Sequence, residues 1–167
     1  STKGFHMSTQ VYSQRADHEL FKRYPLTERQ ITVGRVTSPY HIYDGKMMFI
    51  SGTADWSAVR ELLQDQQMIP LRTETGKALM ALWICDFTEA NLGAHQELQI
   101  SFFVSERLED GVSDDPMQLL KRMSLDTHLK MLCYGLWNNT ETVVAYNREL
   151  LGLDARLTHG SIRTDST

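Results

Sequence analysis

Two neighbouring segments with strand patterning constrain the fold of this chain most. Residues 78–87 are almost continuously apolar, which is typical of a strand covered on both faces. Residues 97–105 instead alternate between two faces, with Leu98, Ile100, Phe102 and Val104 on one side and Gln99, Ser101 and Phe103 on the other. A short turn containing Gly93 lies between the two segments. We therefore expect a mainly antiparallel sheet at the centre of an α+β fold.

Helix signals lie on both sides of these strands. Residues 14–24 have mixed helical spacing of apolar side chains and are followed by a proline. Asp55 is a suitable N-cap for an amphipathic helix that ends before Pro70. An Asp-Asp-Pro run at 114–116 predicts the start of a helix over 117–122 or slightly beyond. These helices are expected to flank the sheet.

Turn signals divide the remaining regular segments. Those at 37–40 and 44–45 predict a hairpin made of residues 41–43 and 46–51. Residues 130–137 and 140–146 complete the regular pattern, and the second of these segments fits either a strand or a helix. We find no repeat, linker or low-complexity tract, so residues 8–167 are expected to form one domain.

Composition excludes several classes of protein. The 17 Lys and Arg against 21 Asp and Glu give a net charge of −4, which argues against a nucleic-acid partner. Apolar residues make up 41% and charged residues 23%, as in ordinary globular domains. No apolar run has the length of a membrane span, and no secretory signal opens the chain. Residues 1–7 resemble an expression remnant before an initiator Met. We expect a cytoplasmic protein without a membrane partner.

The sequence lacks the usual signatures of metal, cofactor or nucleophile sites. It contains no Gly-rich phosphate loop, nucleophile elbow, His-Glu-x-x-His or Cys-x-x-Cys. The histidines are scattered without ligand spacing, so we expect no metal and no cofactor. Cys85 and Cys133 each lie in an apolar run and are expected to be reduced core thiols. Asn138-Asn139-Thr140 matches a glycosylation acceptor, a match we ascribe to chance.

Two segments carry candidate chemistry. Glu97 opens a strand just after a turn, where partial desolvation would raise its pKa toward the range useful for proton transfer. The alternative is a solvated edge carboxylate. Arg148 and Glu149 follow an apolar segment, and adjacent opposite charges of this kind are usually surface residues.

Taken in order, these segments resemble the acetoacetate decarboxylase-like superfamily from about residue 38 to residue 157. Residues 38–40 and 54–59 resemble its early strand pair and its Asp-x-x-Ala-hydrophobic helix. Residues 86–97 resemble its Gly-x-Tyr-x-Glu turn, and residues 140–152 its Asn-Glu…Gly-Arg-Glu-hydrophobic element. The resemblance implies a cone-like β-barrel or curved sheet with a few flanking helices.

The resemblance also implies a catalytic lysine, activated by a second lysine, that forms a Schiff base with a keto acid. At those two positions this chain has Ala155 and Arg156. Arginine cannot replace the lysine because its guanidinium stays protonated. The family's substrate-side arginine aligns near Thr53 and a buried carboxylate with Met80, whereas Glu97 is retained together with Arg148 and Glu149. We therefore expect the scaffold without its Schiff-base chemistry.

Chain length adds an expectation about partners. Members of the superfamily continue well beyond the Arg-Glu element to finish the barrel, whereas this sequence ends at residue 167. A half-closed sheet exposes an edge and an apolar face. We expect a homo-oligomer or a second chain, such as the other product of a cleavage, to complete the barrel; a short self-sufficient variant is the third possibility.

Two functions follow from these observations. The first is a lyase-like enzyme of secondary metabolism that acts on a keto acid or polyketide-like small molecule by decarboxylation, dehydration or C–C cleavage. Its catalytic residues would be Glu97, Arg148 and Glu149, and its substrate-binding residues Met80, His95 and Arg156. Met80, Glu97 and Arg148 are expected to share one pocket. The second is an inactive ligand-binding or accessory subunit on the same scaffold.

Overall fold

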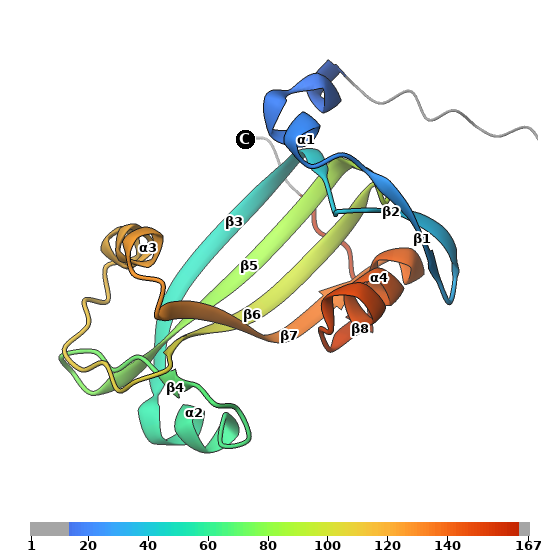
Figure 1. Ribbon diagram of the computed structural model, residues 1–167. Coiled ribbons are helices and arrows are strands. Elements are labelled where there is room, and N and C mark those ends of the chain that lie inside the picture. Colours follow the sequence, from blue (N-terminus) through green and yellow to red (C-terminus); the bar gives the residue numbers. More distant parts are fainter. Residues whose placement is uncertain (1–13, 164–167) are drawn as a thin grey trace, which may run out of the picture.

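A long, curved sheet forms the centre of the computed structural model, which describes residues 14–163 (Figure 1). The sheet has six strands in the order β3-β5-β6-β7-β8, with the short β4 paired to β6. All pairs are antiparallel except β7 with β8, which are parallel. The strands are β3 (Ile42–Asp55), β4 (Ile69–Pro70), β5 (Lys77–Ala90), β6 (His95–Ser105), β7 (Leu129–Asn138) and β8 (Ala155–Leu157). Residues 1–7, interpreted from the sequence as an expression remnant, lie outside the described residues.

The N-terminal elements lie at one end of this sheet (Figure 1). A 3-10 turn, η1 (Gln14–Asp17), and a short helix, α1 (Glu19–Arg23), replace the single helix predicted over 14–24. His18 separates them because its imidazole caps α1 by accepting from the Leu20 amide. A separate hairpin follows, formed by β1 (Thr27–Ile31) and β2 (Gly34–Ser38).

The sheet has two faces with different coverings. One face carries Cys85, Glu97 and Asn138 in register, and α4 (Glu141–Leu151) packs against it; we call it the α4 face. The helix α3 (Pro116–Leu125) covers the other end of the same face. The opposite face carries Ile84, Leu98 and Trp137 in register, and α2 (Trp56–Leu62) covers only one end of it.

Most local predictions are confirmed. The expected strands lie inside β5 and β6, and Asp55 caps α2 by accepting from the Ala58 amide over 2.9 Å. Asp115 caps α3 in the same way. The segment 140–146, which fitted two interpretations, belongs to the helix α4, whose residues 143–147 are buried between the sheet and the β1–β2 hairpin. Both cysteines are free; Cys85 is buried and Cys133 is half-buried.

The predicted hairpin over 41–51 is wrong. Residues 42–55 form one strand, and Asp44-Gly45 lies at an irregularity in its pairing with β5 instead of at a turn. A Cβ at Gly45 would lie 2.7 Å from the Asp86 carbonyl oxygen. Glycine is therefore needed here for the close approach of two backbones.

The predicted fold class is confirmed as α+β with a mainly antiparallel sheet. The sheet does not close into a barrel within residues 14–163, where β3 and β8 are its edges. The same residues contain no helix with both the length and the hydropathy that crossing a bilayer requires.

Candidate functional site

A chain of buried side-chain hydrogen bonds links the sheet to α4 at Glu97. Asn138 Nδ2 donates to Glu97 Oε2 over 2.9 Å, and Asn138 Oδ1 accepts from Asn147 Nδ2 over 3.0 Å. The Asn138 side chain is wholly buried, and Asn147 is nearly so. These bonds hold the carboxyl group of Glu97 in one orientation on the α4 face.

Local sequence explains how these three residues meet. Glu97 follows the turn at Gly93, whose φ of +88° favours glycine, and it pairs with Asn138 at the end of β7. The chain then forms α4 and returns as β8 parallel to β7, so α4 must pack on one face of the sheet. Asn147 lies on the buried side of α4 and reaches Asn138.

Burial dominates the electrostatics of this cluster. Desolvation raises the pKa of Glu97, and donation from Asn138 opposes that rise. No ion pair involving Glu97 occurs among the described residues. Burial, followed by the charge of Glu97, raises the pKa of both Cys85 and Cys133 to about 11. Both thiols are therefore neutral near pH 7, and neither is an activated nucleophile.

Tyr40 and His95 form a second polar pair on the same side. His95 Nδ1 lies 2.8 Å from the Gly93 carbonyl oxygen, so this nitrogen carries the proton and Nε2 accepts from the Tyr40 hydroxyl. Desolvation lowers the pKa of His95, and burial together with the Glu97 charge raises that of Tyr40. Both groups are thus neutral. His95, predicted as a substrate-binding residue, lies two residues before Glu97 but has its two ring nitrogens already engaged.

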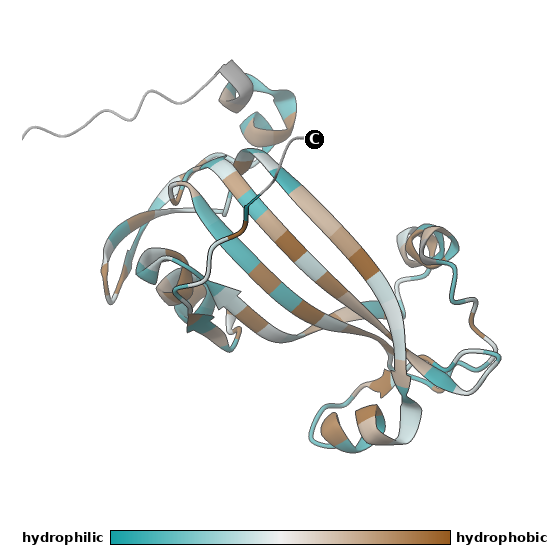
Figure 2. Ribbon diagram, turned by 180° about the vertical axis from the view of Figure 1, so that it is seen from behind, coloured by the Kyte–Doolittle hydropathy of each residue, from teal (hydrophilic) through white to brown (hydrophobic). Residues whose placement is uncertain are grey.

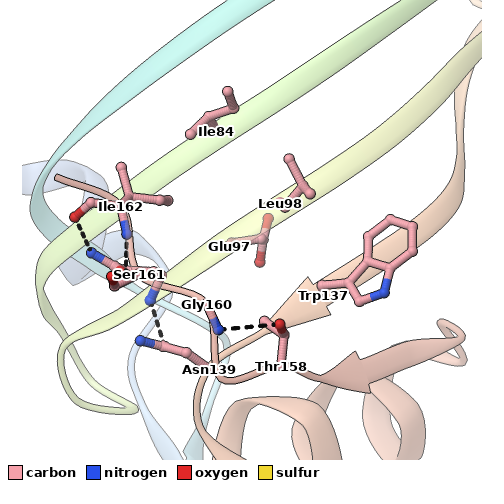
Figure 3. A pocket seen from close by; sticks show the side chains of 10 residues that line it. Ile84, Glu97, Leu98, Trp137, Asn139, Thr158, Gly160, Ser161 and Ile162 are labelled. Atoms are coloured by element: carbon pink, nitrogen blue, oxygen red, sulfur yellow. Dashed lines mark hydrogen bonds between the residues drawn. The ribbon is translucent and has the colours of Figure 1, made fainter.

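An apolar cavity lies across the sheet from these residues, on the opposite face. It has a volume of about 450 Å³, with Ile84, Leu98 and Trp137 on its floor and residues 158–162 over it (Figure 3). Glu97 belongs to its wall through the β6 backbone, because alternation along the strand turns its carboxyl group to the α4 face.

The structure does not bring the predicted site residues into one pocket. Arg148 is exposed on α4, where its Nε donates to the Ala155 carbonyl oxygen over 2.6 Å. Glu149 accepts from the Thr32 amide at 3.0 Å and 3.2 Å. Arg148 and Glu149 line a cavity beside the β1–β2 turn that Glu97 does not line. The expectation that Glu97 and Arg148 share a hollow is therefore wrong.

The other two predicted residues also lie away from the carboxyl group of Glu97. Met80 packs with α2 on the opposite face of the sheet. Arg156, on β8, lies with its guanidinium 5.8 Å from the Trp137 ring centroid and pairs with Asp154 over 2.8 Å. The side chains of both residues point to the face opposite the α4 face, on which Trp137 also lies, whereas the carboxyl group of Glu97 lies on the α4 face.

Sequence reasoning missed the amides that orient Glu97. Asn138 drew attention only as part of a glycosylation pattern, yet its side chain is wholly buried and bonded on both sides. The sequence did contain a signal for Asn138, because a polar residue at the end of an apolar strand can form a hydrogen bond with a polar group inside the core. Only the register of β6 with β7 identifies that partner as Glu97.

Among residues 14–163 no group of three or more His, Cys, Asp or Glu side chains could hold a metal ion. Comparison of the chain with protein-family models, with curated proteins and with solved structures finds no match.

Proposed function

We propose that this protein is a small-molecule enzyme in which Glu97 moves protons on a carbonyl substrate without forming a Schiff base. The observation that carries the proposal is a desolvated carboxyl group that a buried amide orients and no described cation neutralises. Such a group exchanges protons near neutral pH more readily than an exposed glutamate. The acetoacetate decarboxylase-like scaffold is part of this proposal.

The exposure of the described lysines supports a reaction without a Schiff base. Every lysine that the structure describes is exposed, and none is bonded to Glu97 or to its neighbours: Lys22, Lys46, Lys77, Lys121 and Lys130. An activated lysine needs a desolvated site to lose its proton. Ala155, at one of the family's two lysine positions, is buried against Leu136 and Val144.

The position of Arg148 narrows the substrate class. Because its guanidinium lies at a different cavity, it is not placed to hold a substrate carboxylate beside Glu97. A neutral, polyketide-like carbonyl compound therefore fits better than a keto acid, and dehydration fits better than decarboxylation.

The proposed dehydration needs one residue, Glu97, as both the base and the acid. The Glu97 carboxylate takes a proton from the carbon next to a carbonyl, and the C–H electron pair moves into an enolate. The enolate then expels the β-hydroxyl group, which leaves as water after receiving the proton from Glu97. The neutral thiols of Cys85 and Cys133 take no part.

Hydrogen exchange tests this step directly. 4-Hydroxybutan-2-one in D₂O should exchange its C3 protons, and dehydrate, faster with the protein than in buffer. Glu97→Gln should lower the enzymatic rate by about 100-fold or more, the usual weight of a general base. Glu61→Gln, on an exposed carboxylate of α2, is the matched control and should keep the rate. Equal rates in the wild type and Glu97→Gln would contradict the proposal.

A ligand-binding function is the second candidate. The cavity of about 450 Å³ on the opposite face supports it, because that cavity has the size of a small-molecule site while the carboxyl group of Glu97 turns away from it. Binding of small carbonyl compounds without proton exchange would favour this candidate.

We also propose that β3 associates with a second copy of the chain or with another chain. Its outer edge has no strand partner within residues 14–163, and Met47 and Met48 are 59% and 57% exposed there. Residues 47–54 of this edge carry no charged side chain, and long edges of this kind tend to pair with other strands. Sedimentation should show a species larger than one chain, and Met47→Lys should shift it toward the monomer. A monomeric wild type would contradict association between copies.

A further inference from the structure

A strap formed by residues 158–162 crosses the end of the sheet on the face opposite α4 (Figures 2 and 3). Gln96 fastens its far end, since Ile162 N donates to Gln96 Oε1 over 2.8 Å and Gln96 Nε2 donates to the Ile162 carbonyl oxygen over 3.0 Å. At the near end the Thr158 amide donates to the Asn138 carbonyl oxygen over 2.9 Å. The strap is thus held at two points and exposed between them.

The space under the strap is not filled by its own side chains. A cavity of about 450 Å³ remains between the strap and a floor of Ile84, Leu98 and Trp137. Leu98 is 36% exposed there, although it lies in the middle of the sheet. An apolar floor of this kind gains free energy when a ligand removes it from water.

Uncharged polar groups border this floor. Asn139 Oδ1 already accepts from the Gln96 amide over 2.7 Å, whereas Asn139 Nδ2 and Ser161 Oγ have no hydrogen-bond partner among the described residues. Both can donate to a carbonyl oxygen. Arg156 is not in the lining, and its guanidinium is paired with Asp154.

We propose that the cavity under the strap binds a neutral aromatic small molecule that carries a carbonyl group. The ring lies on Ile84, Leu98 and Trp137, and the carbonyl oxygen accepts from Asn139 or Ser161. A carboxylate is disfavoured because the lining offers it no cation. This proposal rests on the second candidate function, ligand binding, and names its ligand class; it is independent of the enzymatic step, since the cavity lies across the sheet from the carboxyl group of Glu97.

Binding of a matched pair of probes tests the proposal. 2-Acetylnaphthalene is the neutral carbonyl probe, and 2-naphthoate is the anionic probe of similar size; equilibrium dialysis gives both dissociation constants. We expect the neutral probe to bind at least about tenfold more tightly. Leu98→Arg should weaken its binding at least about tenfold, which corresponds to about 1.4 kcal/mol. Ile50→Arg is the matched control, because Ile50 is 46% exposed on the same face but outside the cavity.

Further measurements separate this site from others. Nuclear Overhauser contacts from the wild-type protein should connect the probe with the methyl groups of Ile84 and Leu98, a readout that does not depend on any variant folding. Glu97→Gln should leave binding within about twofold, so loss of the proposed enzymatic step and loss of this site are distinguishable. Equal weakening by Leu98→Arg and Ile50→Arg would overturn the proposal, as would equal or tighter binding of 2-naphthoate or contacts confined to other methyl groups.

Discussion

Asn138 donates from Nδ2 to Oε2 of Glu97 across two neighbouring strands, at a distance of 2.9 Å. The same amide accepts from Asn147 on α4 with its other end, so both functions of one buried side chain are used. The orientation of the carboxyl group therefore depends on a neutral amide, and its protonation responds to burial more than to a charged partner.

Asn138→Ala tests the contribution of this amide. The substitution leaves Asn147 Nδ2 without its acceptor and Glu97 without its donor, so we expect the free energy of unfolding to fall by about 1–3 kcal/mol. The pKa of Glu97 should rise further, because donation from Asn138 lowers it. Urea unfolding and carboxyl ¹³C titration measure the two effects. Gln66→Ala, on an exposed amide, should change neither, and a lower pKa for Glu97 in Asn138→Ala would contradict the assignment.

Glu97→Gln should alter the pH dependence of stability. Burial raises the folded-state pKa of Glu97, so the folded chain holds this proton more tightly than the unfolded chain. The stability from this site is present below the ordinary glutamate pKa and is lost as pH rises through the folded pKa. The stability of the variant should thus gain on that of the wild type as the pH rises above the ordinary glutamate pKa of 4.5. Urea midpoints of the two proteins should diverge with rising pH, and a constant difference would count against a raised pKa.

His95→Gln should weaken the acid sensitivity of the fold. Desolvation lowers the folded-state pKa of His95, so stability from its neutral form is lost as pH falls through the ordinary histidine pKa of about 6.5. Burial also lowers the pKa of His41, so this histidine accounts for part of the pH dependence of stability that remains in the variant. Thermal unfolding near pH 7 and near pH 5 measures this pH dependence. His128→Gln, on an exposed histidine, serves as the control; an unchanged slope in His95→Gln would contradict a neutral Tyr40–His95 pair.

Gly45→Ala should destabilise the sheet by about 1–3 kcal/mol, the usual range for overpacking. The new Cβ would lie 2.7 Å from the Asp86 carbonyl oxygen, and both groups belong to paired backbones. Gly52→Ala on the same strand is the matched control, since its Cβ would meet only Met80 Cγ at 4.0 Å. The control should be neutral or slightly stabilising because alanine costs less chain entropy. Equal effects at the two glycines in urea unfolding would show that residues 42–55 do not pair as described.

Alkylation should report the thiol environment. With a pKa of about 11 against an ordinary value of 9.0, Cys133 has a thiolate fraction about 100-fold smaller than a free thiol at pH 8. Iodoacetamide should modify it slowly in the native protein and at the free-thiol rate in urea. Glu97→Gln should speed the native reaction, since the Glu97 charge contributes to the raised pKa. Fast native modification would contradict a half-buried, protonated thiol at Cys133.

Local sequence patterns determined the elements of this protein. The alternation over 97–105 and the apolar run over 78–87 identify strands from neighbouring residues alone. Asp55 and Asp115 likewise cap helices by accepting from amides only two or three residues away. The hairpin over 41–51 was predicted wrongly because Asp-Gly signals a turn in isolation. The crowding of Gly45 against β5 appears only when both strands are in place.

Tertiary structure alone decided which side chains meet at the candidate site. Glu97 was identifiable from its place at the mouth of a strand, but its partner Asn138 is 41 residues away and is chosen by strand register. Arg148 follows Asn147 directly, yet each step along an α-helix turns by about 100°. The helical conformation of 141–151 therefore directs Asn147 into the core and leaves Arg148 exposed, a separation that sequence order cannot reveal.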